Sequence, residues 1–179
     1  AGGLWLGQVE YMPGDWAKFS IITDGNNTVE LERAYLKVDE NGNSWWRIGW
    51  VDGEDIWIYE TLISSEGSLL RLRAKDAEGN EGEIPVAGQQ IYFPPQEVTN
   101  ESIEGATQGK ASLSTQAGVF NCDHVVFLAV YGQGQVEWWI TKDVPGGVAQ
   151  YQIVDQGNVL WKSTVIAKGK NATTILGSF

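Results

Sequence analysis

Apolar and polar residues alternate along most of this chain, and aromatic or β-branched residues occupy many of the apolar positions. Successive side chains of a strand point to opposite faces of a sheet, so this period of two predicts strands. No stretch keeps the i, i+3, i+4, i+7 spacing of an amphipathic helix over three turns. We expect an all-β protein with strands near 4–11, 15–23, 28–38, 44–51, 55–63, 68–75, 83–93, 110–116, 119–131, 135–142, 148–154, 158–168 and 172–178.

Turn dipeptides that contain glycine separate many of the expected strands. Glycine adopts the positive φ that tight hairpin turns require, so each dipeptide marks a reversal of the chain. They are Asp24-Gly25, Asn41-Gly42, Asp52-Gly53, Glu66-Gly67, Glu78-Gly79, Gly146-Gly147 and Gln156-Gly157. Residues 94–109 lack this pattern. They are polar and begin with two prolines, which predicts a long connection, with room for one helical turn, between two meanders.

The number of expected strands limits the architecture. Thirteen strands exceed what one flat sheet holds, so the sheet either curls into an antiparallel half-barrel or splits into a β-sandwich. Either arrangement leaves edge strands. The chain has 179 residues, of which 42% are hydrophobic, and this is enough for a single β domain over residues 1–179 without metal or disulfide support.

Charge and composition narrow the partners and the location. The formal net charge of −11 opposes the phosphates of nucleic acid and anionic lipid surfaces. No apolar run approaches the roughly 18 residues that cross a bilayer. The chain begins Ala1-Gly2-Gly3, which fits removal of a signal peptide, and it has acceptor sequons at Asn26, Asn100 and Asn171. We therefore expect a secreted protein, extracellular or on the cell surface, with glycans at these asparagines.

Catalytic chemistry has few candidates in this sequence. His124 is the single histidine and Cys122 the single cysteine, and both are expected on one face of the strand at 119–131. Zinc needs further ligands, a cysteine nucleophile needs an orienting group, and no Gly-x-Ser-x-Gly sequence offers a serine nucleophile. We expect a protein that is not an enzyme. A catalytic pair of carboxylates, as in glycosidases, can form between neighbouring strands and then has no characteristic spacing in the sequence. The sequence therefore neither predicts nor excludes such a pair.

Two acidic loops are candidates for a calcium ion. Asp39, Asn41 and Asn43 place oxygen side chains at alternate positions around a glycine, and Asp76 and Glu78 do the same in a second loop. The alternative is an ordinary hairpin turn, since neither loop is followed by the bidentate Glu of the twelve-residue calcium motif. Calcium is therefore the cofactor that the sequence leaves open.

The nine tryptophans are several times the usual number. Adjacent strand residues face opposite ways, so neither Trp45 with Trp46 nor Trp138 with Trp139 can share one core layer. Three explanations compete: both faces of the sheet are buried, the indoles stack on sugars, or they contact another subunit. The candidate ligand or partner aromatics are Trp45, Trp46, Trp50, Trp57, Trp138 and Trp139.

The N-terminal residues are strand-like up to the end of the chain. A terminal strand either pairs within its own sheet or is donated to the open edge of a neighbouring subunit. Donation of residues 1–10 is a head-to-tail contact that does not close, so it builds a filament. The side chains expected to enter the neighbour are Leu4, Trp5, Leu6 and Val9.

Several loose motifs follow one another in an order found in secreted prokaryotic proteins of uncharacterised type. They are Met12-Pro13-Gly14-Asp15-Trp16-Ala17-Lys18-Phe19, the Trp46 strand with its Asp52-Gly53 turn, Gly82-Glu83-Ile84-Pro85-Val86, Thr115-Gln116-Ala117-Gly118-Val119-Phe120-Asn121-Cys122-Asp123-His124-Val125, Trp139, and Asp143-Val144-Pro145-Gly146-Gly147-Val148-Ala149-Gln150-Tyr151. In this order they resemble the periplasmic lipoprotein-carrier (LolA-like) superfamily. The resemblance implies an antiparallel half-barrel whose concave face shelters acyl chains, and it brings no catalytic residues.

Two features differ from those of a lipid carrier: the tryptophan content is high, and the chain has one methionine, the flexible residue that suits an adaptable apolar groove. With the strand-like ends, the acidic composition and the sequons, the surplus of tryptophan favours as the leading hypothesis a non-enzymatic extracellular structural subunit that forms a homo-polymer by β-strand complementation. The alternative is a LolA-like carrier or binder of a lipid or another apolar ligand. A carbohydrate-binding module that uses exposed tryptophans is the second alternative.

Overall fold

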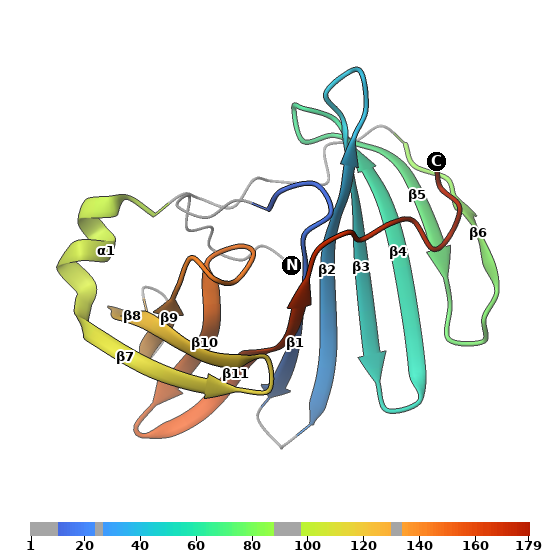
Figure 1. The fold of residues 1–179 in the computed structure, drawn as a ribbon. Helices are drawn as coiled ribbons and strands as arrows, with labels where there is room; N and C mark the ends of the chain where they lie inside the picture. The colour runs from blue at the N-terminus through green and yellow to red at the C-terminus, as the bar shows by residue number, and fades with distance from the viewer. Residues whose placement is uncertain (1–10, 24–26, 88–97, 130–133) are drawn as a thin grey trace.

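The structure of the chain is a computed structural model that describes residues 11–23, 27–87, 98–129 and 134–179. In these ranges the chain forms one antiparallel sheet of 11 strands and one helix, α1 (Asn100–Ala106) (Figure 1). The strands are β1 (Trp16–Thr23), β2 (Thr28–Val38), β3 (Ser44–Asp52), β4 (Asp55–Ile63), β5 (Leu69–Lys75), β6 (Glu81–Ile84), β7 (Thr107–Thr115), β8 (Gly118–Leu128), β9 (Gln135–Ile140), β10 (Val148–Asp155) and β11 (Asn158–Gly169). The all-β prediction is confirmed.

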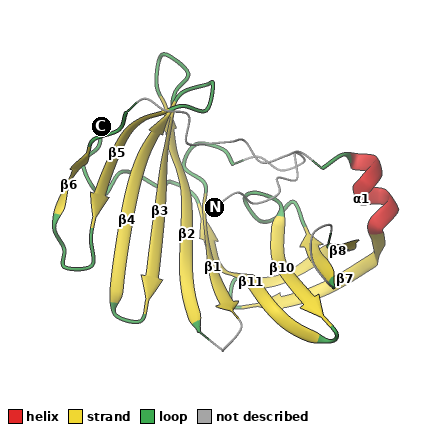
Figure 2. Cartoon of the chain, turned by 180° about the vertical axis from the view of Figure 1, so that it is seen from behind, coloured by secondary structure: helices red, strands yellow, loops and turns green. Residues whose placement is uncertain are grey.

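The sheet consists of two meanders that share one seam. The strand order is β6-β5-β4-β3-β2-β1-β11-β10-β9-β8-β7, so neighbours in sequence pair within each meander and β1 pairs with β11 between them. This pairing runs from Trp16–Gly169 to Thr23–Trp161. Of the two predicted architectures, the curled, open sheet is therefore confirmed (Figure 2). The prediction of a β-sandwich is wrong, because the seam keeps both meanders in one sheet.

The connection between the meanders contains α1. Thr99 caps the helix, because its hydroxyl accepts a hydrogen bond from the backbone N–H of Ser102 at 3.2 Å. The helix ends at Ala106, and β7 begins at the next residue, three positions before the strand start predicted from the sequence. The helical turn expected between residues 94 and 109 is thus present, although residues 94–97 lie outside the described ranges.

Three predicted strands differ from the structure. Residues 172–178 are not a strand; they cross the sheet as an irregular segment, for a reason given below. The strand expected at 83–93 is the shorter β6, which ends before Pro85, a residue with no N–H to donate to a sheet. Of the strand expected at 4–11, residues 4–10 lie outside the described ranges and Tyr11 is not in a strand.

Three clusters of buried side chains hold the sheet to its surroundings. The first joins α1 to the sheet through Ile103, Val125, Trp138 and Ile140. The second joins β8, β10 and β11 to the loop after β9 through Phe120, Cys122, Val144, Ala149 and Val165. The third lies on β2 and β3 and consists of Ala34, Leu36 and Trp45. Among the described residues, no helix has the length and apolar character to cross a bilayer.

Candidate functional site

One face of β1–β4 carries large apolar side chains in register. Phe19 on β1 pairs with Leu31 on β2, and Leu31 pairs in turn with Trp50 on β3. Trp50 pairs with Trp57 on β4. Cross-strand partners share a face, so these four side chains form one row across four strands. All four are half-buried, and we call them the apolar row.

The neighbouring positions on the same face are also mainly apolar. Tyr35 on β2 stacks on Trp46 of β3 with their ring centroids 4.3 Å apart, and Tyr11 meets the same indole edge-on at 5.4 Å. Burial raises the pKa of Tyr11 to about 12, with the Arg33 charge opposing the rise and the Asp15 charge adding to it. The Tyr11 phenol therefore keeps its proton at neutral pH.

The opposite face of the same strands is polar at its centre. Arg47 on β3 pairs with Glu60 on β4, and Glu60 pairs with Arg73 on β5. The last residues of the chain, 170–179, leave β11 and run across this face over β2, β3 and β4 toward β5 (Figure 1). We call residues 170–179 the crossing segment.

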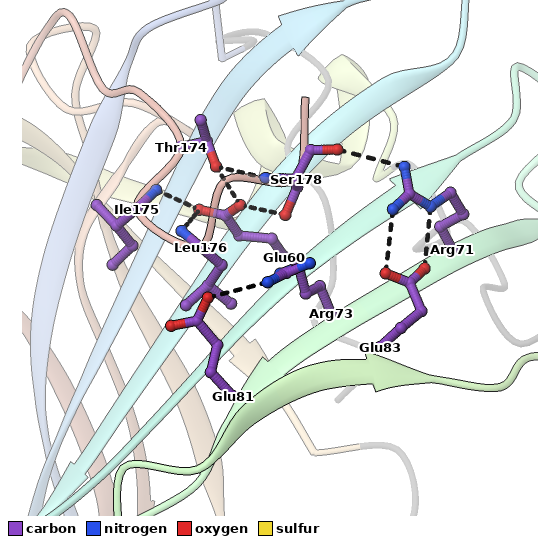
Figure 3. Close-up of polar contacts among 9 residues, drawn as sticks. All are labelled: Glu60, Arg71, Arg73, Glu81, Glu83, Thr174, Ile175, Leu176 and Ser178. Carbon is purple, nitrogen blue, oxygen red and sulfur yellow. Dashed lines mark hydrogen bonds and ion pairs between the residues drawn. The ribbon is translucent and has the colours of Figure 1, made fainter.

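Glu60 is the anchor of the crossing segment. Its carboxylate is 0% exposed and accepts hydrogen bonds from the Thr174 hydroxyl at 2.6 Å and the Ser178 hydroxyl at 2.5 Å (Figure 3). It also accepts the backbone N–H groups of Ile175 and Leu176, at 2.8 and 3.4 Å. A buried carboxylate is stable when its lone pairs are used in this way. The segment thus follows an irregular path because its backbone donors bond to Glu60 rather than to a strand.

Two arginines hold the backbone oxygens of the crossing segment. Arg47 donates to the Thr173 carbonyl at 2.6 Å and to Glu32 at 2.9 Å. Arg71 donates to the Ser178 carbonyl at 3.2 Å while its guanidinium forms a two-point ion pair with Glu83 (Figure 3). The segment is therefore bound to β3, β4 and β5 through both its donors and its acceptors.

We expect the crossing segment to loosen in acid. Burial raises the pKa of Glu60, but the hydrogen bonds from Ser178, Thr174 and two backbone N–H groups outweigh it and hold this pKa below its ordinary value of 4.5. A carboxyl group whose folded pKa is lowered stabilises the fold above its unfolded pKa, and this stabilisation is lost as the pH falls through the folded pKa. Thermal unfolding measured between pH 7 and pH 3 should show it.

The matched control for this pH dependence is Glu60→Gln. The pKa values of Asp39, Asp76 and Glu83 are also lowered, mainly by side-chain hydrogen bonds, so every variant loses some stability in acid. The difference in stability between the wild type and Glu60→Gln reports the contribution of the Glu60 carboxylate alone. We expect this difference to become smaller below about pH 4.5. A difference that stays constant down to pH 3 would contradict the assignment.

The tryptophan candidates divide between the two faces. Trp45 is buried beneath the crossing segment, with its ring 5.5 Å from the Phe179 ring, whereas Trp46 lies on the opposite face with Trp50 and Trp57. Trp138 is buried in the cluster with α1, and its neighbour Trp139 stacks on His124 at 4.6 Å. The expectation that adjacent tryptophans face opposite ways is thus met at both pairs.

His124 and Cys122 have different surroundings in the structure. His124 Nε2 lies 3.0 Å from a Glu137 carboxylate oxygen. Cys122 is buried, and burial, with the nearby Asp123 and Asp143 charges, raises the pKa of its thiol, so the thiolate is disfavoured. Among the described residues, no group of three or more His, Cys, Asp or Glu side chains is placed to hold a metal ion.

The two acidic loops use their aspartates to close turns. Asp39 accepts hydrogen bonds from the backbone N–H groups of Asn41 and Asn43, and also from the Asn43 side chain. Asp76 accepts the backbone and side-chain N–H groups of Asn80 in the same manner, and Glu78 lies exposed in this turn. The alternating oxygen pattern therefore has a structural explanation as hairpin closure. Calcium binding at these loops stays a prediction.

The remaining predicted sites are at the surface or outside the described ranges. Asn100 and Asn171 are exposed, and Asn26 is not described. The assembly strand at 1–10, with Leu4, Trp5, Leu6 and Val9, also lies outside the described ranges. Glycosylation and strand donation stay predictions from the sequence.

Comparison with known proteins finds similarity in structure alone. No protein-family model matches the chain, and no curated protein matches it. The crystal structure of MucB, a periplasmic protein, matches 93% of this chain and 56% of MucB with a TM-score of 0.55 and 11% identity. The structure of MucB in complex with MucA(peri) matches 97% of this chain and 56% of that chain with a TM-score of 0.54 and 12% identity.

The chain has a LolA-like fold. This confirms the fold that the sequence resemblance implied, and at this level of identity the likeness concerns the fold alone. The chain spans about half the length of MucB. An exported protein with a YmcC-like fold from Bacteroides fragilis matches 94% of this chain and 100% of its own length, with a TM-score of 0.46 and 9% identity.

Proposed function

We propose that this protein is a non-enzymatic binding protein that works outside the cytoplasm and holds an apolar ligand against the apolar row. The observation that carries the proposal is the row itself: Phe19, Leu31, Trp50 and Trp57 lie in register across four strands of an open sheet. A set of half-buried aromatic and aliphatic side chains on one face gives an apolar ligand continuous contact area.

The opposite face of the same strands is already covered, which leaves the face of the apolar row for a ligand. Glu60, Arg47 and Arg71 are already bonded to the crossing segment, so that face is occupied by the chain itself. The periplasmic location of MucB, which shares the fold, supports a place for this protein outside the cytoplasm. The alternative function that the sequence offered, a LolA-like binder, thus has more support than the filament subunit.

Binding of an apolar probe tests the proposal. In a titration with the neutral dye N-phenyl-1-naphthylamine, we expect Trp50→Ala to weaken binding about tenfold or more, because burial of a large apolar side chain is worth roughly 1.5–3 kcal/mol. Ile56→Ala is the matched control, since Ile56 lies on β4 next to Trp57, faces the other side and is 49% exposed. Absence of dye binding to the wild-type protein would remove the proposal.

Assembly through a donated strand is the second candidate. The sheet ends in two edge strands, β6 and β7, whose outer backbone groups pair with no strand of the described ranges. Open edges of this kind accept an added strand. A homo-polymer built by residues 1–10, with or without glycans, therefore stays a proposal, and size measurement of a chain that lacks residues 1–9 beside the full chain would test it.

A further inference from the structure

Arg33 is a charged side chain in the middle of an apolar surface. It lies on β2 two residues from Leu31, so it shares the face of the apolar row. Its cross-strand partners are Ala17 on β1 and Ile48 on β3. The next residue along β2 on this face is Tyr35, which stacks on Trp46. Arg33 is thus surrounded by aliphatic and aromatic positions on all four sides.

No carboxylate of the described residues is bonded to Arg33. In the described ranges, Arg33 forms no hydrogen bond or ion pair with another side chain, whereas Arg47, Arg71 and Arg73 each bond to a glutamate. The positions that pair across the face beside it are apolar or aromatic. The nearest acidic residue on this face is Asp15, which lies opposite Tyr35 and whose carboxylate already bonds to the Met12 N–H and to Lys170. Arg33 is half-buried.

A half-buried guanidinium that no described side chain bonds gains much from an anion. Removing part of its hydration costs free energy that an oxyanion can offset through a two-point hydrogen bond. The planar guanidinium fork fits both carboxylate and phosphate oxygens. An anion placed at Arg33 also lies beside Leu31, the member of the apolar row that is two residues away on the same face of β2.

We infer that the ligand of the apolar row is an anionic amphiphile, with its acyl or alkyl chain on Phe19, Leu31, Trp50 and Trp57 and its single negative headgroup at Arg33. This inference rests on the proposed function and adds the chemical class of the ligand. The headgroup is a carboxylate or a phosphate monoester, because Arg33 binds either through the same two oxygens.

The acidic character of the whole protein does not prevent this binding. The net charge of −11 repels extended anionic surfaces at long range. At an ionic strength of about 0.15 M, however, charges are screened beyond roughly 8 Å, so a single headgroup responds mainly to Arg33 itself. The site thus selects one anionic head on an apolar tail rather than a polyanion.

Displacement of N-phenyl-1-naphthylamine from the full chain tests the inference. The competitors are hexadecanoic acid, hexadecyl phosphate and hexadecan-1-ol, each at a concentration at which it stays dissolved as single molecules. We expect the two anions to bind about tenfold or more tighter than the alcohol, since a hydrogen bond to a charged group is worth that much. The advantage of the anions should shrink as salt is added, and the affinity of the alcohol should not.

Two variants assign the effect to Arg33. In Arg33→Gln we expect the anions to bind no better than the alcohol, with the alcohol unchanged, and in Arg33→Lys part of the advantage should remain. Lys18→Gln is the matched control, because Lys18 lies beside Ala17 on β1 but faces the other side, where it pairs with Glu30. We expect it to behave as the wild type.

The outcomes separate the two proposals. Equal affinity of the wild type for the acid, the phosphate and the alcohol would overturn the role of Arg33 and leave the apolar row as a binding surface. An anion advantage that survives Arg33→Gln in full would overturn it as well. If none of the three competitors nor the dye binds, the proposed function itself is wrong. A difference between acid and phosphate would identify the headgroup.

Discussion

Glu60→Ala is expected to lower the free energy of unfolding by about 3 kcal/mol or more and to release the crossing segment. The substitution leaves two backbone N–H groups and the hydroxyls of Thr174 and Ser178 without their acceptor, and a buried unsatisfied group costs roughly 1–3 kcal/mol. Urea unfolding followed by tryptophan fluorescence measures the loss. Limited proteolysis should then cut the chain between residues 170 and 179.

Two neighbouring threonines supply the controls for this experiment. Thr174→Ala removes one hydroxyl donor to Glu60 and should cost about 1 kcal/mol. Thr173→Ala removes an exposed side chain whose residue is held through its backbone carbonyl, so it should change stability by less than about 0.5 kcal/mol. If Glu60→Ala were as stable as Thr173→Ala, Glu60 would not be the anchor of the segment.

Trp138→Ala is expected to be the other strongly destabilising change, at about 3–5 kcal/mol. The indole is 2% exposed and packs with Ile103, Val125 and Ile140, so its removal loses apolar burial and leaves a cavity under α1. Hydrogen exchange should show α1 opening together with β8 and β9. Circular dichroism melting gives the overall loss.

Leu128→Ala is the matched control for Trp138→Ala. Leu128 lies at the end of β8, in the same hairpin as Trp138, but its side chain is 78% exposed. Its truncation should change stability by no more than about 0.5 kcal/mol. Comparable losses in the two variants would mean that Trp138 does not anchor the helix.

The fold followed from the sequence because its signals are local. Alternation placed β1–β5 and β7–β11 within a few residues, and the glycine turns separated many of them, since a hairpin depends on a few adjacent residues. The opposite facing of Trp45 and Trp46, and of Trp138 and Trp139, followed from strand geometry alone. The choice of a curled sheet over a β-sandwich needed the β1–β11 pairing, which joins positions as far apart as Trp16 and Gly169 and leaves no local pattern.

The crossing segment was predicted as a strand for a physical reason. Residues 172–178 have the β-branched and apolar composition of a strand, but their donors bind a carboxylate that lies over 110 residues earlier. One signal was available: Glu60 is the single charged residue in the stretch from Ile56 to Ile63. A charged residue at an inward strand position needs partners, and its position indicated a polar site without showing what fills it.

The apolar row and Arg33 also depend on pairing. Each member follows the alternation of its own strand, but the alignment of Phe19, Leu31, Trp50 and Trp57 is set by three separate registers. A shift of one residue in any of them would move a member to the opposite face. Trp50 and Trp57 were candidates from their residue type, whereas Phe19, Leu31 and Arg33 carried no distinguishing sequence signal.

The seam between β1 and β11 also sets the order in which the protein can fold. β1 is among the first strands to emerge during synthesis or export, and its partner β11 is the last, so the first meander must wait with one side of β1 unpaired. Pairing between such distant residues is slow, because the loop-closure entropy must be overcome first. Until the seam closes, β1 offers an open edge to other chains, so aggregation during folding should depend on how long the last strand is delayed.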